Sequence, residues 1–104
     1  MAHQALTEAV YYILLSLTVP RHGYGIMQNT EALSGGRVRL AAGTLYGALT
    51  SLLDKGWIEA LPGDTDSRKK EYIITAAGRE VLRAELARLR ELVENGTEIL
   101  GGEK

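Results

Sequence analysis

Apolar residues recur every three or four positions through most of the chain, which is the spacing of helices that bury one face. This spacing runs through residues 6–17, 26–33 and 42–55, and it resumes after Thr75, a typical helix N-cap. The segment PRHGYG at residues 20–25 separates the first two stretches and predicts a turn. The pattern therefore predicts four helices.

Apolar and polar residues alternate in two short stretches, residues 57–61 and 71–75, with a charged, turn-rich segment between them. This alternation predicts a two-stranded hairpin. Residues 34–40 predict either a short strand or an extended linker. Three helices followed by a hairpin form the element order of a winged helix-turn-helix, so we expect a mainly α fold with a small β-hairpin wing. We expect a DNA-binding domain over residues 1–75 and a C-terminal dimerisation helix over residues 76–104.

The third predicted helix has two different faces. Its leucines lie at helical spacing and are expected to hold it to the domain, with Gly56 ending it. The other face carries short hydroxyls, one phenol and one glycine, which permit close approach to base edges and phosphates. This face consists of Thr44, Tyr46, Gly47, Thr50 and Ser51.

Cations flank that helix in the sequence, although the net charge of the 104-residue chain is only −1. Arg37 and Arg39 precede the helix, and a basic trio stands in the hairpin turn, where it could neutralise phosphates. An exposed hydroxyl face or a basic turn is, taken singly, more often just solvated. The near-neutral charge also leaves open a winged helix that contacts only proteins. The predicted DNA-binding residues are Arg39, Thr44, Tyr46, Gly47, Thr50, Ser51, Arg68, Lys69 and Lys70.

Two helices carry more apolar surface than a single small domain needs. The first is apolar on nearly two faces, and the last repeats leucines at heptad spacing, a pattern that packs against another helix. The alternative is that the last helix folds back on its own domain. The predicted dimer-interface residues are Leu6, Val10, Leu14, Leu82, Leu86, Leu89 and Val93.

Other classes of function have little support in the sequence. The chain has no cysteine, and His3 and His22 are isolated, so no metal site and no cofactor are expected. No catalytic motif is present, which argues against an enzyme. The stretch AVYYILLSL is too short to cross a bilayer, so we expect no membrane association and a cytoplasmic protein.

Three sequence motifs resemble the PadR family of bacterial transcriptional regulators, in its short form with one C-terminal helix. They are HGYGI, AAGTLYGALTSLLDKGWIE and RKKEYIITAAGREVL, and the match extends from about residue 6 to residue 93. The resemblance implies a homodimeric repressor that binds double-stranded DNA at an inverted-repeat operator. It also implies release by a small-molecule effector or another signal.

Two features depart from the family pattern. Ala41 and Ala42 stand where many relatives have a Ser-Pro start, so the third helix is expected to be less well capped. Short relatives that bind flat drugs use an aromatic residue on the last helix, and this chain has none after Tyr72. This departure argues against multidrug sensing.

Overall fold

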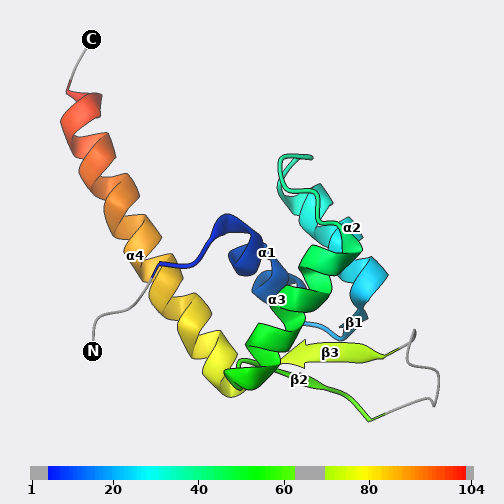
Figure 1. The fold of residues 1–104 in the computed structure, drawn as a ribbon. Coiled ribbons are helices and arrows are strands. Elements are labelled where there is room, and N and C mark those ends of the chain that lie inside the picture. Colours follow the sequence, from blue (N-terminus) through cyan, green and yellow to red (C-terminus); the bar gives the residue numbers. More distant parts are fainter. Residues whose placement is uncertain (1–4, 63–69, 103–104) are drawn as a thin grey trace.

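The computed structural model describes residues 5–62 and 70–102, which form four helices and a small sheet (Figure 1). This architecture confirms the predicted mainly α winged-helix class. The elements in chain order are α1 (Glu8–Ser16), β1 (Arg21–His22), α2 (Gly23–Leu33), α3 (Ala42–Asp54), β2 (Ile58–Ala60), β3 (Glu71–Ile74) and α4 (Ala76–Gly101).

The core lies where α1, α2 and α3 meet the sheet and the start of α4. Leu45, Leu49 and Leu52 of α3 are at most 2% exposed, as the leucine spacing predicts. They pack in one cluster with apolar residues of α1, α2, α4 and the strands β2 and β3. The fully or nearly fully buried apolar residues are Ile13, Leu14, Leu17, Ile26, Leu45, Leu49, Leu52, Ile58, Tyr72, Ile74 and Leu82.

The sheet has three strands in the order β1-β3-β2, one more than the predicted hairpin. Strand β3 is central, with Tyr72 opposite Arg21 on one side and opposite Ala60 on the other, and both pairings are antiparallel. The prediction of a turn over residues 20–25 was wrong in part, because β1 begins at Arg21 and α2 already begins at Gly23. A strand of two residues is too short to show alternation, so the sequence pattern could not reveal it.

The connection from α2 to α3 is an extended linker, not a strand. Gly35 and Gly36 have φ values of 64° and 85°, in the left-handed region that glycine adopts without a steric penalty. They reverse the chain after α2 and allow residues 38–40 to approach the start of α3.

Helix α4 begins on the domain and then leaves it. The Thr75 hydroxyl accepts a hydrogen bond from the Gly78 backbone N–H, the N-cap that the sequence predicts. Gly78 lies so close to the Trp57 carbonyl that a Cβ at this position would be 2.7 Å from Ile74 Cγ1 and nearer still to the carbonyl oxygen. Beyond Leu89 the helix projects away from the other elements as a single rod (Figure 1).

Candidate nucleic-acid interface

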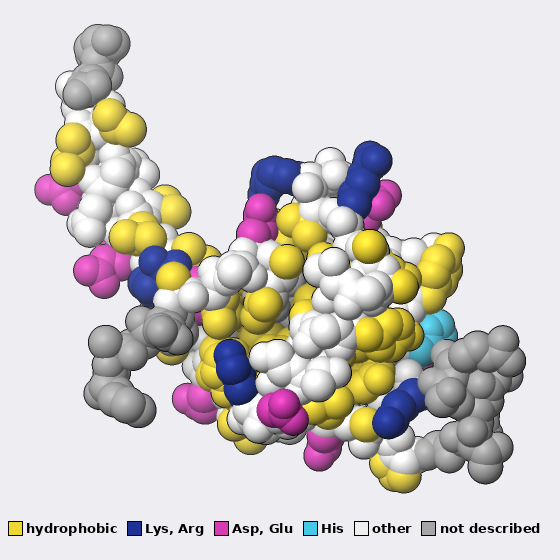
Figure 2. All heavy atoms as spheres, viewed as in Figure 1, with side chains coloured by type: hydrophobic (Ala, Val, Ile, Leu, Met, Phe, Trp, Pro, Cys, Tyr) yellow, Lys and Arg dark blue, Asp and Glu magenta, His cyan; other side chains and the backbone are white. Residues whose placement is uncertain are grey.

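The outward face of α3 brings together the five side chains that the sequence assigns to it. Thr44, Tyr46, Gly47, Thr50 and Ser51 are all exposed. They face outward because the buried leucines of the same helix fix its rotation against the core. Figure 2 shows uncharged side chains over the middle of α3. An uncharged, shallow helix face suits insertion into a groove lined by base edges.

Tyr46 serves the fold and the surface at the same time. Its side chain lies against Gly23 at the start of α2, where a Cβ would be 2.9 Å from Tyr46 Cζ and closer to the hydroxyl oxygen. It also lies near Tyr72, whose pKa is raised first by burial and then by the Tyr46 phenol. Tyr46 nevertheless remains 45% exposed. One edge of the ring therefore packs on the domain while the rest is available to a ligand.

Gly47 is the one position in the middle of this face without a side chain. Apart from its chain neighbours and the backbone of its own helix, no atom lies within 4 Å of the place where its Cβ would be, so packing in the described chain does not require glycine there. A helix-interior glycine costs about 0.5–1 kcal/mol relative to alanine. The fold does not need this gap. Close approach by another molecule would require it.

The hydroxyl group of Thr50 already donates a hydrogen bond within α3. Thr50 Oγ1 donates to the Tyr46 carbonyl oxygen at 2.9 Å, so its lone pairs remain available as acceptors.

Ala41, the N-cap of α3, makes no side-chain capping bond, as predicted from the missing Ser. The first backbone N–H groups of α3 therefore lack a side-chain acceptor at the cap.

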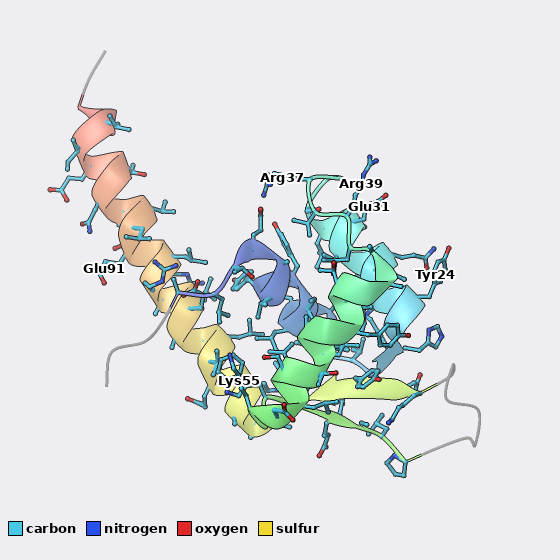
Figure 3. The ribbon with its side chains drawn as sticks, in the orientation of Figure 1. Tyr24, Glu31, Arg37, Arg39, Lys55 and Glu91 are labelled. Atoms are coloured by element: carbon cyan, nitrogen blue, oxygen red, sulfur yellow. The ribbon has the colours of Figure 1, made fainter. Side chains whose placement is uncertain are left out.

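Cations lie at both ends of α3 (Figure 3). Arg39 precedes the helix, and its Nε donates to the Gly36 carbonyl oxygen at 3.2 Å and lies 3.8 Å from a Glu31 carboxylate oxygen. The Arg39 side chain is 75% exposed, so these contacts leave it accessible. Lys55 follows the helix, with Nζ 4.8 Å from the centre of the Trp57 ring.

The basic residues at the wing are only partly described. Lys70 is exposed and immediately precedes β3. The predicted contacts Arg68 and Lys69 lie outside the described residues. Among the described residues of the wing, Lys70 is the basic one.

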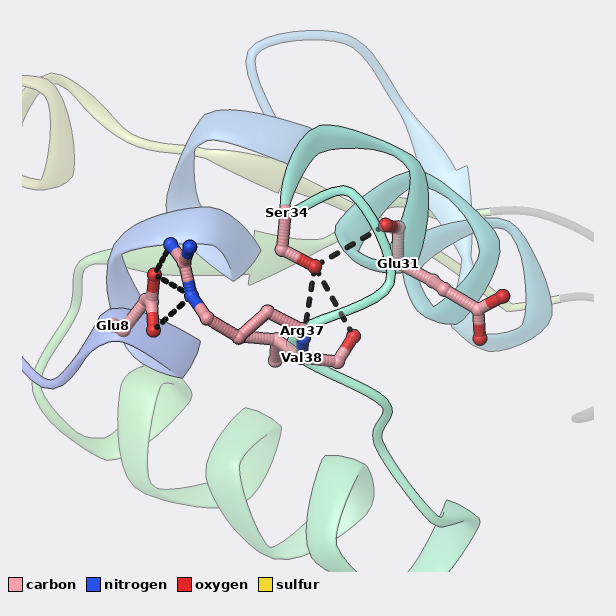
Figure 4. A network of polar contacts seen from close by, with 5 residues as sticks. All are labelled: Glu8, Glu31, Ser34, Arg37 and Val38. Atoms are coloured by element: carbon pink, nitrogen blue, oxygen red, sulfur yellow. Dashed lines mark hydrogen bonds and ion pairs between the residues drawn. The ribbon is translucent and has the colours of Figure 1, made fainter.

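Arg37 is directed away from this interface. Its guanidinium pairs with the Glu8 carboxylate at the start of α1, with Nε 3.0 Å from Oε2 (Figure 4). The hydrogen bond from Arg37 lowers the pKa of Glu8, and the same bond raises the pKa of Arg37. Arg37 therefore ties the turn before α3 to α1.

The same turn is held from within by Ser34. Its hydroxyl donates to the Glu31 carbonyl oxygen at 3.1 Å and accepts the Val38 backbone N–H at 2.8 Å (Figure 4). These bonds fix the course of the linker that delivers Arg39 to the start of α3.

One exposed aromatic residue was not among the predicted site residues. Tyr24 is 64% exposed in the first turn of α2, next to the Gly23 on which Tyr46 lies (Figure 3). The motif HGYG contains it, but the sequence alone leaves open whether its ring packs in the core or contacts a DNA phosphate. Its position adds a second phenol beside the α3 face.

The apolar surface left for a partner is narrower than predicted. Leu14 is fully buried and Leu82 is 8% exposed, so their assignment to an interface was wrong because both belong to the core of the single chain. Leu6, Val10 and Leu89 are half-buried. The large apolar residues of α4 that remain exposed are Leu86, Leu92, Val93, Ile99 and Leu100.

Residues 5–62 and 70–102 contain no group of three or more His, Asp or Glu residues that could hold a metal ion. Within the same part of the chain, no helix is long and apolar enough to span a membrane.

Solved structures with the same fold include two proteins that are 25% identical to this chain. A PadR family transcriptional regulator from Eggerthella lenta matches with a TM-score of 0.71, over 90% of this chain and 82% of that one. The RosR protein of H. salinarum matches with a TM-score of 0.70, over 99% of this chain and all of that one. A PadR-like transcriptional regulator from Bacillus cereus, 19% identical, shares the fold with a TM-score of 0.71, over 92% of both chains.

Among curated proteins, the chain is 41% identical over 66 residues to an uncharacterized 37.1 kDa protein in transposon TN4556 of Streptomyces fradiae. The match covers 64% of this chain but only 18% of that protein. The chain thus corresponds to a small part of this relative's length.

The family model for the transcriptional regulator PadR-like family matches residues 11–84, which is more than half of the chain. The match includes the whole of α2, α3 and the sheet. Members of this family are DNA-binding transcriptional regulators and not enzymes. The resemblance carried by the sequence motifs is thereby confirmed, and the chain belongs to the PadR-like family of transcriptional regulators.

Proposed function

We propose that this protein binds a specific DNA sequence by placing α3 in the major groove. The observation that carries the proposal is the outward face of α3, where Gly47 leaves a gap that the fold does not need. The major groove, about 12 Å wide, admits one helix, and short hydroxyls can approach base edges within it. Arg39 and Lys70 would then neutralise phosphates on either side, with the wing on the adjacent backbone or minor groove.

We also propose that the active form is a homodimer joined through α4. The exposed residues Leu86, Val93 and Leu100 are spaced by seven, so they form one stripe along α4. Leu89 borders the stripe and is half-buried, as are Leu6 and Val10 near the start of α1. Residues 1–75 would form the DNA-binding domain and residues 76–104 the dimerisation helix. Two copies of α3 would then be spaced by about 34 Å or a multiple, matching an inverted-repeat operator.

The regulatory role that fits this arrangement is repression released by a small molecule. A dimer bound across an operator near a promoter blocks access to that DNA. A cavity of about 300 Å³ between α1 and α4 lies at the low end of the usual size of ligand sites. Its lining combines apolar, phenolic and charged side chains from Leu6, Glu8, Tyr11, Tyr12, Glu85, Arg88 and Leu89. An effector bound there would alter how α4 sits on the DNA-binding domain.

Selection of binding sites from random duplex DNA, combined with sedimentation of the protein alone, tests the proposal. We expect an enriched inverted repeat and a dimeric mass. The variant Leu86→Glu with Val93→Glu should sediment as a monomer and bind the selected operator at least tenfold more weakly. The matched control Ala84→Glu with Asn95→Glu adds the same two negative charges at exposed positions on the opposite side of α4 and should remain dimeric. Failure to enrich any sequence would favour the alternative, a winged helix that contacts only proteins.

A further inference from the structure

The carboxylate of Glu85 is buried in a helix that otherwise carries its charges on the surface. Glu85 is 1% exposed, and it follows Gly78 and Leu82 as the third buried residue of α4. These three residues lie at positions i, i+4 and i+7, so they share the face of α4 that packs on the domain. Glu85 is therefore the last buried contact before the helix projects into solvent.

Glu85 binds a backbone group of the segment that enters α1. Its Oε2 accepts the Leu6 backbone N–H at 3.0 Å, a contact that joins positions 79 residues apart. Figure 1 shows this segment meeting α4 before it turns into α1. A backbone N–H in one fixed direction allows only a narrow range of positions for α4 relative to residues 5–7.

The charge of Glu85 is balanced within α4 itself. Arg88 donates from Nε to Oε1 at 2.7 Å and from Nη2 to Oε2 at 2.9 Å. The hydrogen bonds to Glu85 raise the pKa of Arg88. Because Arg88 lies on the same helix, this pair compensates for the buried charge without joining α4 to another element. The bond to Leu6, in contrast, crosses between elements.

A leucine at position 85 would continue the apolar face of α4 from Leu82 to Leu89 without burying a charge. Replacing both members of a buried ion pair by apolar residues is often neutral or stabilising, and here the remaining partner, Arg88, has a side chain that is 33% exposed and can turn to solvent. The carboxylate therefore contributes more to the orientation of α4 than to the stability of the fold, since an apolar side chain does not select one orientation of its neighbour.

We propose that Glu85 is a positioning residue, which sets the angle at which the dimerisation half of α4 leaves the DNA-binding domain. Glu98 lies 13 residues further along α4, about 20 Å at 1.5 Å per residue. A tilt of about 10° at Glu85 would therefore move that end by about 3.5 Å. The consequence of this tilt for DNA binding rests on the proposed function, because the same tilt in both subunits of a dimer would change the spacing of the two α3 helices.

The chain has no cysteine, so two introduced cysteines give unique sites for spin labels. Gln28→Cys on α2 and Glu98→Cys on α4 are both exposed, and pulsed electron resonance measures the distance between their labels. Dilution with an excess of unlabelled protein limits the signal to pairs within one chain. The measurement then reports the angle of α4 whether or not the protein is a dimer.

In this background we expect Glu85→Leu to broaden the distance distribution by about 3 Å or more, as the tilt estimate above requires. Glu85→Gln keeps an acceptor for the Leu6 N–H and should remain close to the parent. Glu91→Leu, an exposed glutamate on the same helix, is the matched control and should leave the distribution unchanged (Figure 3). If Glu85→Leu fails to fold by circular dichroism, Glu85→Met replaces it with the same expectation.

A distribution as narrow as the parent's in the folded apolar variant would overturn the proposal, and so would equal broadening in Glu91→Leu. The effect on DNA is measured separately, as the preference for the selected operator over operators lengthened by two base pairs. We expect Glu85→Leu to lose at least fivefold of that preference. If the parent protein shows no DNA binding, the proposed function fails while the distance result on α4 still stands.

Discussion

The phenol of Tyr46 on α3 lies on Gly23, the first residue of α2, with no room for a side chain between them. This contact joins the helix proposed to read DNA to the helix that precedes it in the helix-turn-helix pair. Because Tyr46 is still 45% exposed, the same ring is positioned by the fold and presented to a ligand.

Gly23→Ala tests this contact without touching the exposed face. The added methyl group must displace the Tyr46 ring, and overpacking of this kind costs typically about 1–3 kcal/mol. We expect a loss of that size in the free energy of unfolding measured with urea, together with weaker DNA binding. Tyr46→Ala in the same background should restore part of the stability and none of the binding. An unchanged stability in Gly23→Ala would show that the two residues do not pack as described.

Gly47→Ala should separate folding from DNA binding. In the free protein the new methyl group points into open space, and alanine favours the helix, so we expect stabilisation by about 0.5–1 kcal/mol. In the complex the same methyl group should meet the DNA and lower operator affinity at least tenfold. Denaturant unfolding and operator titration measure the two effects. Equal or tighter DNA binding would exclude close approach at Gly47.

Gly96→Ala is the matched control for that substitution. Gly96 is also a helical glycine, and its Cβ would have no neighbour within 4 Å, but it lies in the projecting half of α4. We expect a similar gain in helix stability with no direct effect on contacts between α3 and DNA. Because Gly96 follows Leu89 by seven residues, sedimentation must show that the variant is still a dimer.

Lys70→Ala should reduce the salt dependence of DNA binding. Each phosphate neutralised by a cation contributes about 0.9 to the slope of log K against log salt. Lys70 is exposed beside the central strand, so its removal should lower the slope by about one and weaken binding to all sequences alike. Glu71→Ala, which removes the neighbouring negative charge, should not lower the slope. An unchanged slope in Lys70→Ala would rule out a phosphate contact by this residue.

Glu8→Gln should remove a pH-dependent contribution to stability. The hydrogen bond from Arg37 lowers the pKa of Glu8 in the folded chain, so the folded state binds a proton less readily than the unfolded state. The contribution is fully present above the unfolded pKa, about 4.3 for glutamate, and is lost as pH falls through the lower folded pKa.

Urea unfolding of wild type and Glu8→Gln between pH 7 and pH 3 checks this expectation. The difference in stability should be small, because the pair is exposed, and it should shrink toward the acidic end of the range. Arg37→Gln should show the same pH profile as Glu8→Gln. A difference between wild type and Glu8→Gln that persists unchanged at pH 3 would contradict the assignment.

Much of the fold follows from local patterns in the sequence. The spacing of Leu45, Leu49 and Leu52 determines both the existence of α3 and the identity of its exposed face. Thr75 and Gly56 mark element ends through capping and a φ of 76°, which are properties of single residues. Such features depend on only a few neighbouring residues, so they can be predicted from the sequence alone.

The remainder depends on contacts between distant segments. Leu14 has the same helical spacing as Val10, and no local rule says which of the two faces the core and which remains partly exposed. The contact of Tyr46 with Gly23 and the bond of Glu85 to Leu6 each join separate helices. In the sequence, Glu85 looks like one more charge in a surface helix, and its burial depends on distant segments that pack against α4, residues 5–7 among them.

The central claim, that the outward face of α3 reads DNA, is tested most directly by titrating the protein with DNA from upstream of its own coding region. Fluorescence anisotropy over about 50–200 mM salt should give a linear fall of log K with log salt. It should also give an affinity at least about 10³-fold above that for a scrambled duplex of the same length. Equal affinity for both duplexes, or no binding at the lowest salt, would contradict the claim.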